Sequence, residues 1–83
     1  MKVEKVGKKF LVRVTCKKGK DLLVSIIEAF ENLNLNIFQA KAACKHFFFM
    51  EAVVEDEDQV LDVKDVTEAV MTAIQKSSND MAM

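Results

Sequence analysis

Few residues of this chain have the types and spacing that catalysis requires. Its 83 residues include one histidine, His46, and two cysteines, Cys16 and Cys44. Cys44 stands two residues before His46, so a cysteine–histidine nucleophile pair is one interpretation. A packed core thiol near an exposed turn histidine is the other, and we favour it because nothing else in the sequence supports the pair. We therefore predict no catalytic residues and no enzymatic activity.

Metal and cofactor sites are not predicted either. No Cys-x-x-Cys pair occurs, and the two cysteines lack the spacing of metal ligands. The sequence shows no signal-peptide pattern and no apolar run long enough to cross a bilayer. We therefore expect both cysteines to be small buried thiols in a reducing compartment, and we expect no membrane partner.

A basic loop, Lys17, Lys18, Gly19 and Lys20, precedes a predicted helix. Backbone amides at a helix start, together with lysines, can bind an anion. A solvated turn closed by a flexible glycine is the simpler interpretation, because a single glycine is a weak phosphate signal. The lysine-rich start is offset by the acidic region Glu51–Glu68, and the net charge is −1, so no overall field attracts nucleic acid.

Two amphipathic helices are predicted around these residues. The first follows Asp21, which can cap it, and Asn34 suits the left-handed turn that ends it. Its apolar stripe has helical spacing and comprises Leu22, Leu23, Ile26, Ile27, Phe30 and Leu33. The second helix is predicted over Val63–Lys76 with Asp62 as its cap, and its stripe comprises Val63, Val66, Val70, Ala73 and Ile74. Residues 77–83 show no period and are predicted to form a flexible tail.

Four strands are predicted, and the first, Lys2–Val6, is short and of mixed character. The other three, Lys9–Lys17, Asn36–Cys44 and Phe47–Glu55, alternate like half-buried strands. Gly7 and Lys8 suit a two-residue type II′ hairpin turn between the first two strands. One face of the later strands is predicted to meet the helices through Phe10, Val12, Val14, Cys16, Phe38, Ala40, Ala42, Cys44, Phe48, Met50, Ala52 and Val54. The acidic run 55–58 is interpreted as a solvated loop.

The order ββαββα predicts a single α+β domain over residues 1–76. It gives a four-stranded, mainly antiparallel sheet with both helices on one face. The right-handed crossover rule places Lys9–Lys17 beside Phe47–Glu55 in the centre of the sheet. Lys2–Val6 and Asn36–Cys44 then become the edge strands.

The sheet face away from the helices is predicted to carry apolar side chains among polar ones. Two phenyl rings on one uncovered strand indicate a contact surface, whereas scattered apolar residues would be ordinary. Arg13 and Glu51 lie on neighbouring strands there and can pair. We predict self-association through this face, through the edge strand Asn36–Cys44, or through both. The predicted contact residues are Leu11, Ile37, Phe38, Gln39, Lys41, Phe47, Phe49 and Val53.

Several short motifs follow one another at characteristic spacing: Val3-Glu4, Phe10–Cys16, Gly19, Leu22-Leu23, Ile26–Phe30, Leu33-Asn34-Leu35, the strand around Ala40, and Val66–Ile74. In this order they resemble the ACT-like domain found at the C-terminal end of many plant basic helix-loop-helix (bHLH) transcription factors. The resemblance implies an ACT-like, ferredoxin-like sandwich whose ββαββα order is a circular rearrangement of the ACT order βαββαβ. It also implies a nuclear, regulatory and non-enzymatic dimerisation module that pairs with itself or with related bHLH proteins.

The same resemblance leaves an alternative, an amino-acid-sensing domain. ACT domains of metabolic enzymes bind amino acids near the loop after the first core strand, usually at a Pro-Gly turn. Here Gly19 matches, lysines flank it and the proline is missing; such a sensor would use Lys18, Gly19, Lys20 and Asn36. An acyl-phosphate hydrolase of this architecture would need an arginine in that loop, which is absent. The basic region and helix-loop-helix are not in this sequence, so we expect no direct contact with nucleic acid.

Overall fold

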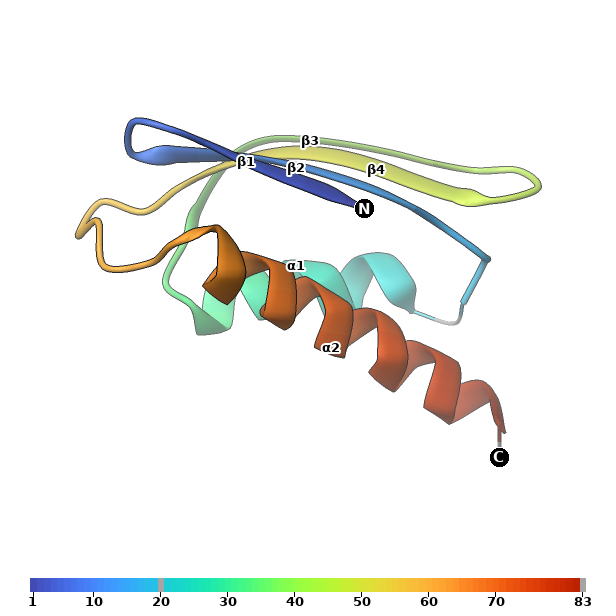
Figure 1. Ribbon diagram of the computed structural model, residues 1–83. Coiled ribbons are helices and arrows are strands. Elements are labelled where there is room, and N and C mark those ends of the chain that lie inside the picture. Colours follow the sequence, from blue (N-terminus) through green and yellow to red (C-terminus); the bar gives the residue numbers. More distant parts are fainter. Residues whose placement is uncertain (20, 83) are drawn as a thin grey trace.

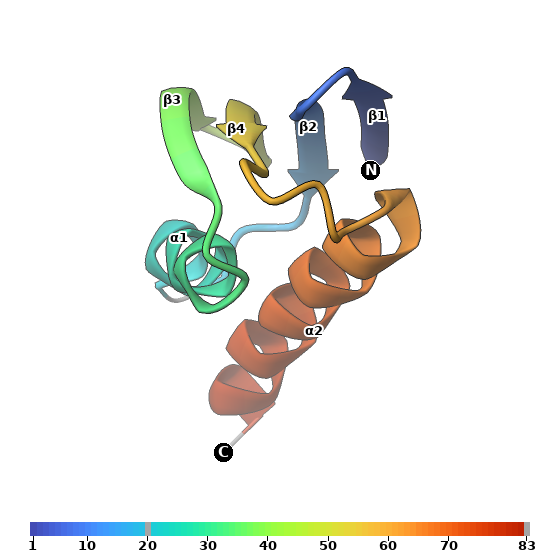
Figure 2. The ribbon, with the colours of Figure 1, turned by 90° about the vertical axis from the view of Figure 1, so that its left-hand side faces the viewer.

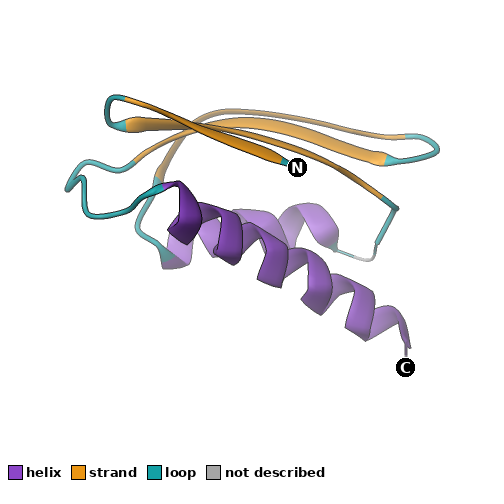
Figure 3. Ribbon diagram, in the orientation of Figure 1, coloured by secondary structure: helices purple, strands orange, loops and turns teal. Residues whose placement is uncertain are grey.

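The computed structural model describes residues 1–19 and 21–82, which form a sheet layered on two helices (Figure 1; Figure 3). The predicted ββαββα order and the α+β, ferredoxin-like architecture are confirmed. The elements are β1 (Lys2–Val6), β2 (Lys9–Cys16), α1 (Leu22–Asn32), β3 (Asn36–Cys44), β4 (Phe48–Glu55) and α2 (Val63–Ala82).

The sheet has the strand order β1-β2-β4-β3, and all neighbouring strands are antiparallel. The prediction that β2 and β4 occupy the centre is therefore confirmed. Gly7 has a φ of 62° in the two-residue connection between β1 and β2, as the first position of the predicted hairpin turn requires. Both helices cover the same face of the sheet (Figure 2), so no layer of the described chain lies over the opposite face.

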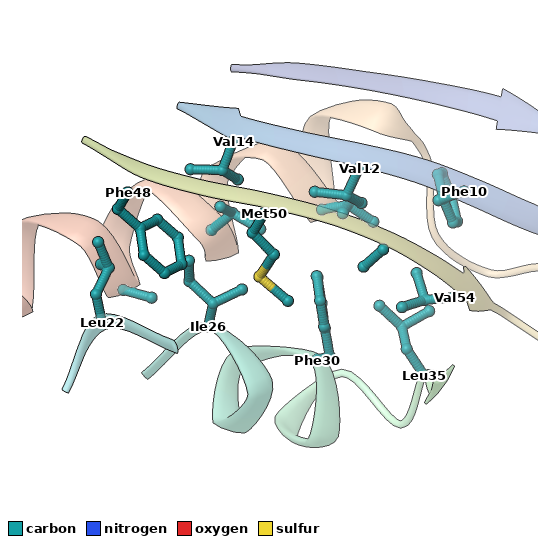
Figure 4. Packing of buried hydrophobic residues seen from close by; sticks show 14 residues of the cluster. Phe10, Val12, Val14, Leu22, Ile26, Phe30, Leu35, Phe48, Met50 and Val54 are labelled. Carbon is teal, nitrogen blue, oxygen red and sulfur yellow. The ribbon is translucent and has the colours of Figure 1, made fainter. Parts of the chain in front are cut away.

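The core lies between the sheet and the helices (Figure 4). Strict alternation in β2 and β4 turns every second residue inward, as predicted. The helices contribute one apolar stripe each. Complete burial of a valine, leucine, isoleucine or phenylalanine side chain stabilises the fold by about 2 kcal/mol. The buried apolar residues are Phe10, Val12, Val14, Leu22, Ile26, Phe30, Leu35, Phe48, Met50, Ala52, Val54, Val66, Val70 and Ala73.

Two of the three predicted capping residues act as expected. Asp62 and Asp65 cap α2 reciprocally, because each backbone N–H donates to the other's carboxylate over 3.0 Å. Asn34 ends α1 with a left-handed φ of 59°, as predicted. The expected capping of α1 by Asp21 is wrong for the side chain: this residue adopts a φ of 55°, and its carboxylate makes no capping hydrogen bond within the described chain.

The C-terminal helix is longer than predicted. The sequence places its end at Lys76, whereas α2 continues to Ala82. Ser77 belongs to the buried side of the helix and is only 1% exposed. That 77–83 is a flexible tail stays a prediction, and its last residue, Met83, lies outside the described residues.

The acidic connection before α2 is only partly the solvated loop that we expect from the sequence. Asp56 is 4% exposed, and its backbone N–H donates to the Lys8 carbonyl over 2.8 Å. Its carboxylate accepts the N–H of Leu61 over 2.8 Å, while the Leu61 carbonyl accepts from Lys5 Nζ over 3.2 Å. One carboxylate therefore fixes the path of the chain into α2.

Candidate protein-interaction surface

The sheet face opposite the helices is here called the open face (Figure 2), and all four paired strands contribute to it. Leu11 of β2 lies directly opposite Val53 of β4, which in turn lies opposite Gln39 of β3. Leu11 is 42% exposed and Val53 is half-buried. Leu11 and Val53 therefore form a short apolar band in the middle of the open face, the face on which the sequence places both residues, and the polar Gln39 continues the same cross-strand row.

A β-bulge in β3 changes which residues lie on this face. Ile37 pairs with the inward-facing Val54, whereas Gln39 pairs with the outward-facing Val53, so Phe38 is the extra residue. The one-residue shift reverses the sheet faces predicted for Ile37 and Phe38. Ile37 lies on the helix side at the sheet edge, and the Phe38 ring lies over the open face with Lys9 Nζ 4.6 Å from its centroid. The predicted placements of Ile37 and Phe38 are therefore wrong, and Phe38 is 55% exposed.

The phenyl rings at the start of β4 are also placed differently from the prediction. Phe49 lies on the open face between Thr15 and Ala43 and is half-buried. Phe47 precedes the strand instead of belonging to it, and it is 61% exposed in the β3–β4 connection. The pair of rings on one strand face is therefore reduced to Phe49, and Phe38 supplies a second ring from β3.

A charged row crosses the open face beside the apolar band. Arg13 Nη2 and Nε lie 2.8 Å and 3.0 Å from Glu51 Oε2, so the predicted pairing of these residues is confirmed. Lys2 Nζ lies 2.9 Å from Glu4 Oε1, and this hydrogen bond and the lysine charge lower the pKa of Glu4. Lys41 extends the row because it lies opposite Glu51. Such exposed pairs contribute little to the stability of the fold.

Between the band and the row the open face is hollowed by about 270 Å³. The lining includes Lys2, Glu4, Leu11, Arg13, Lys41 and Val53. The hollow brings together acidic, basic and apolar side chains. A surface that docks here must therefore match the charges as well as fill the apolar floor.

Strand β3 forms an edge whose nine residues are all exposed. Its inner side pairs with β4, and no other described strand pairs with its outer side. An edge of this kind offers backbone N–H and C=O groups to a partner strand. The side chains from Gln39 to Cys44 include three alanines and one charge, on Lys41, so they oppose close approach only weakly.

The four residues predicted for a ligand loop do not form one site. Asn36 lies opposite Glu55 of β4, which in turn lies opposite Lys9 at the start of β2. Gly19 follows Cys16 at the other end of β2, and Lys9 and Cys16 are about 23 Å apart along the strand. The Asn36 amide donates to Glu57 Oε1 over 3.2 Å. A Cβ on Gly19 would lie 2.8 Å from Ser77 Oγ, so α2 occupies the space beside that loop. Lys18 is exposed, and Lys20 lies outside the described residues.

The sheet does not bring the two cysteines together, and His46 is exposed in the β3–β4 connection. Cys16 and Cys44 both lie opposite Phe48, one on each side of β4, so their Cα atoms are about 10 Å apart. Cys16 is half-buried, and desolvation raises the pKa of its thiol. Cys44 is exposed, which corrects the prediction that both are buried.

No group of three metal-binding side chains is present among the described residues, and no described helix can span a membrane.

Comparison with known proteins assigns the family. The model of the ACT-like domain of plant bHLH transcription factors matches residues 1–75. A solved structure, that of an unknown protein from Galdieria sulphuraria, superposes with a TM-score of 0.70 at 22% identity over 80% of this chain, which supports the fold alone. This chain spans 38% of that protein's length. No curated protein matches the sequence. The chain belongs to the family of ACT-like domains of plant bHLH transcription factors, and it is therefore a regulatory domain.

Proposed function

We propose that this domain acts in the nucleus as a pairing module that controls which bHLH protein its transcription factor joins. The pairing partner is a second copy of the chain or the ACT-like domain of a related bHLH protein. The domain acts by binding and not by catalysis, and it contacts no nucleic acid itself. The open face and the β3 edge are the two surfaces that support this proposal.

One observation carries the proposal most directly: an apolar band lies on a sheet face that no part of the described chain covers. Leu11 and Val53 form the band, and the Phe38 ring lies at its β3 end. A monomer exposes single apolar residues without consequence, but a contiguous patch favours a partner. The exposed β3 edge adds backbone hydrogen bonds as a second means of attachment.

The charged row gives the pairing its selectivity. Arg13 and Glu51 form one ion pair, Lys2 and Glu4 form another, and Lys41 extends the row. A partner that places like charges against this row is disfavoured, while one with complementary charges is admitted. This arrangement suits a domain that selects among relatives that share one fold.

Two leucines of equal exposure allow a controlled test of the surface. Leu11 on the open face is 42% exposed, and Leu23 on α1 is 41% exposed. Leu11→Lys adds a charge to the apolar band twice in each symmetric dimer, so we expect it to weaken dimerisation at least about tenfold. Leu23→Lys adds the same charge on α1, in the helical layer and not on the open face, and should leave the dissociation constant within about twofold of wild type.

Sedimentation velocity over a concentration series measures both dissociation constants. Equal weakening by the two substitutions contradicts a role of the open face, and so does an unchanged dimer in Leu11→Lys.

The amino-acid-sensing alternative has no comparable support. Ser77 packs against Gly19, and Asn36 lies at the far end of the sheet from that loop.

A further inference from the structure

The outer side of the helical layer contains a groove between α1 and α2, which lie side by side beneath the sheet (Figure 2). Each wall is a stripe of residues at helical spacing, and together they border an open groove of about 540 Å³. The α1 wall comprises Ser25, Glu28, Ala29, Asn32 and Leu33, and the α2 wall comprises Asp65, Glu68, Ala69, Thr72, Ala73 and Lys76.

The floor of this inter-helix groove is built from small side chains. Ala29 and Ala69 are half-buried, and Ala73 is buried. Alanines at such positions let the backbone of a third helix approach both walls closely. Leu33 and Leu61 stand at one end of the groove and offer a larger apolar contact.

The rim of the inter-helix groove is acidic. Glu28, Asp65 and Glu68 line it, and Lys76 is the only cation among the lining residues. Glu28 and Glu68 are exposed, and no cation of the described chain forms an ion pair with either. One Asp65 oxygen accepts the Asp62 N–H, so this residue also serves the helix start. Two carboxylates on opposite walls are thus available to a cationic partner.

We propose that the inter-helix groove binds a cationic amphipathic helix of a partner protein. Small apolar residues at spacings of three and four on that helix would meet the alanine floor, and flanking lysines or arginines would reach Glu28 and Glu68. The α2 wall from Asp65 to Lys76 spans about 17 Å, so about three turns of the partner make contact. A helix fits two walls with helical periodicity, which a small ligand would not use.

The inter-helix groove is lined by residues of α1 and α2, and both helices lie on the sheet face opposite the open face (Figure 2). The inter-helix groove and the open face can therefore be occupied at once, and the two proposals stand or fall separately. A dimer joined by the open face would present two such grooves, one on each outer side.

The direct test uses a fluorescein-labelled, alanine-rich peptide of about 15 residues with lysines and arginines along two flanks. A second peptide carries glutamates in place of those cations. Fluorescence anisotropy should show binding of the basic peptide to the wild-type chain and none of the acidic peptide. Failure of the basic peptide to bind at about 1 mM overturns the proposal.

Variants locate the binding site. Glu28→Gln with Glu68→Gln removes the rim charges and should weaken the basic peptide about tenfold. Glu31→Gln with Asp58→Asn removes the same charge from exposed positions outside the groove and should change affinity less than about twofold. Equal weakening by both pairs means unspecific attraction and overturns the proposal.

A third variant tests shape at constant charge. Ala69→Leu fills the floor of the inter-helix groove with a good helix former and leaves the rim intact. The basic peptide should lose at least about fivefold in affinity, because its backbone can no longer approach both walls. Unchanged affinity in Ala69→Leu contradicts docking between the helices.

Discussion

The contact between Gly19 and Ser77 shows how a single residue type fixes the position of α2. A Cβ at position 19 would come 2.8 Å from Ser77 Oγ and 3.7 Å from Ser77 Cβ. Ser77 is 1% exposed, so its side chain has little room to turn away. The glycine that resembles the ligand turn of metabolic ACT domains therefore has a packing role in this chain.

Gly19→Ala should destabilise the domain by about 1 kcal/mol because it overpacks this contact. Combining it with Ser77→Ala leaves two Cβ atoms at an ordinary separation, so the double variant should lose less stability than the sum of the single variants. Urea denaturation of the four proteins of this cycle measures the difference. Strictly additive losses would show that the two residues do not meet.

Some side-chain contacts were predictable from the sequence and others were not. The pairing of Arg13 with Glu51 follows from strand alternation and neighbouring strands, and the structure shows it. The burial of Asp56 was not predictable from the sequence pattern. It depends on the hydrogen bonds of this residue with Leu61 and with Lys8, and Lys8 is far from it in the sequence. No local signal distinguishes this aspartate from its exposed neighbours.

At the scale of elements, alternation succeeds where the register is unbroken. Strands β2 and β4 keep strict alternation over eight residues each, and their inward faces match the prediction. Strand β3 contains a bulge between Ile37 and Gln39, which is set by its hydrogen bonding to β4 and not by its own pattern. Phe38 therefore reaches the open face, where Lys9 supplies a cation over its ring.

The capping of α2 makes a prediction about pH. The backbone N–H of Asp65 lowers the pKa of Asp62 below its ordinary value of 3.8. The unfolded chain therefore binds the proton more readily, so stability from this cap is complete above that value and is lost as the pH falls through the folded pKa. Asp62→Asn keeps a capping side chain without this titration.

Thermal unfolding of the wild type and of Asp62→Asn from about pH 7 to about pH 2 tests this point. The wild-type midpoint should fall more steeply below about pH 4 than that of the variant. Because Asp62 is exposed, the difference should shrink at high salt. Parallel pH profiles would contradict a role of the ionised carboxylate in the cap.

At the scale of the whole molecule, the two layers leave two different surfaces without a partner. The open face combines an apolar band with a charged row, and the helical side carries an acidic groove with an alanine floor. The ββαββα order and the helix stripes made the layers predictable. The groove was not predictable, because it depends on how α1 and α2 pack against each other and not on either stripe alone.

Sedimentation equilibrium of the wild-type chain, from about 1 to about 100 µM, is the most direct test of the pairing proposal. The account predicts that the apparent mass rises with concentration from the chain mass of 9.4 kDa towards twice that value. A mass that stays at 9.4 kDa over the whole range would contradict self-pairing through the open face and the β3 edge.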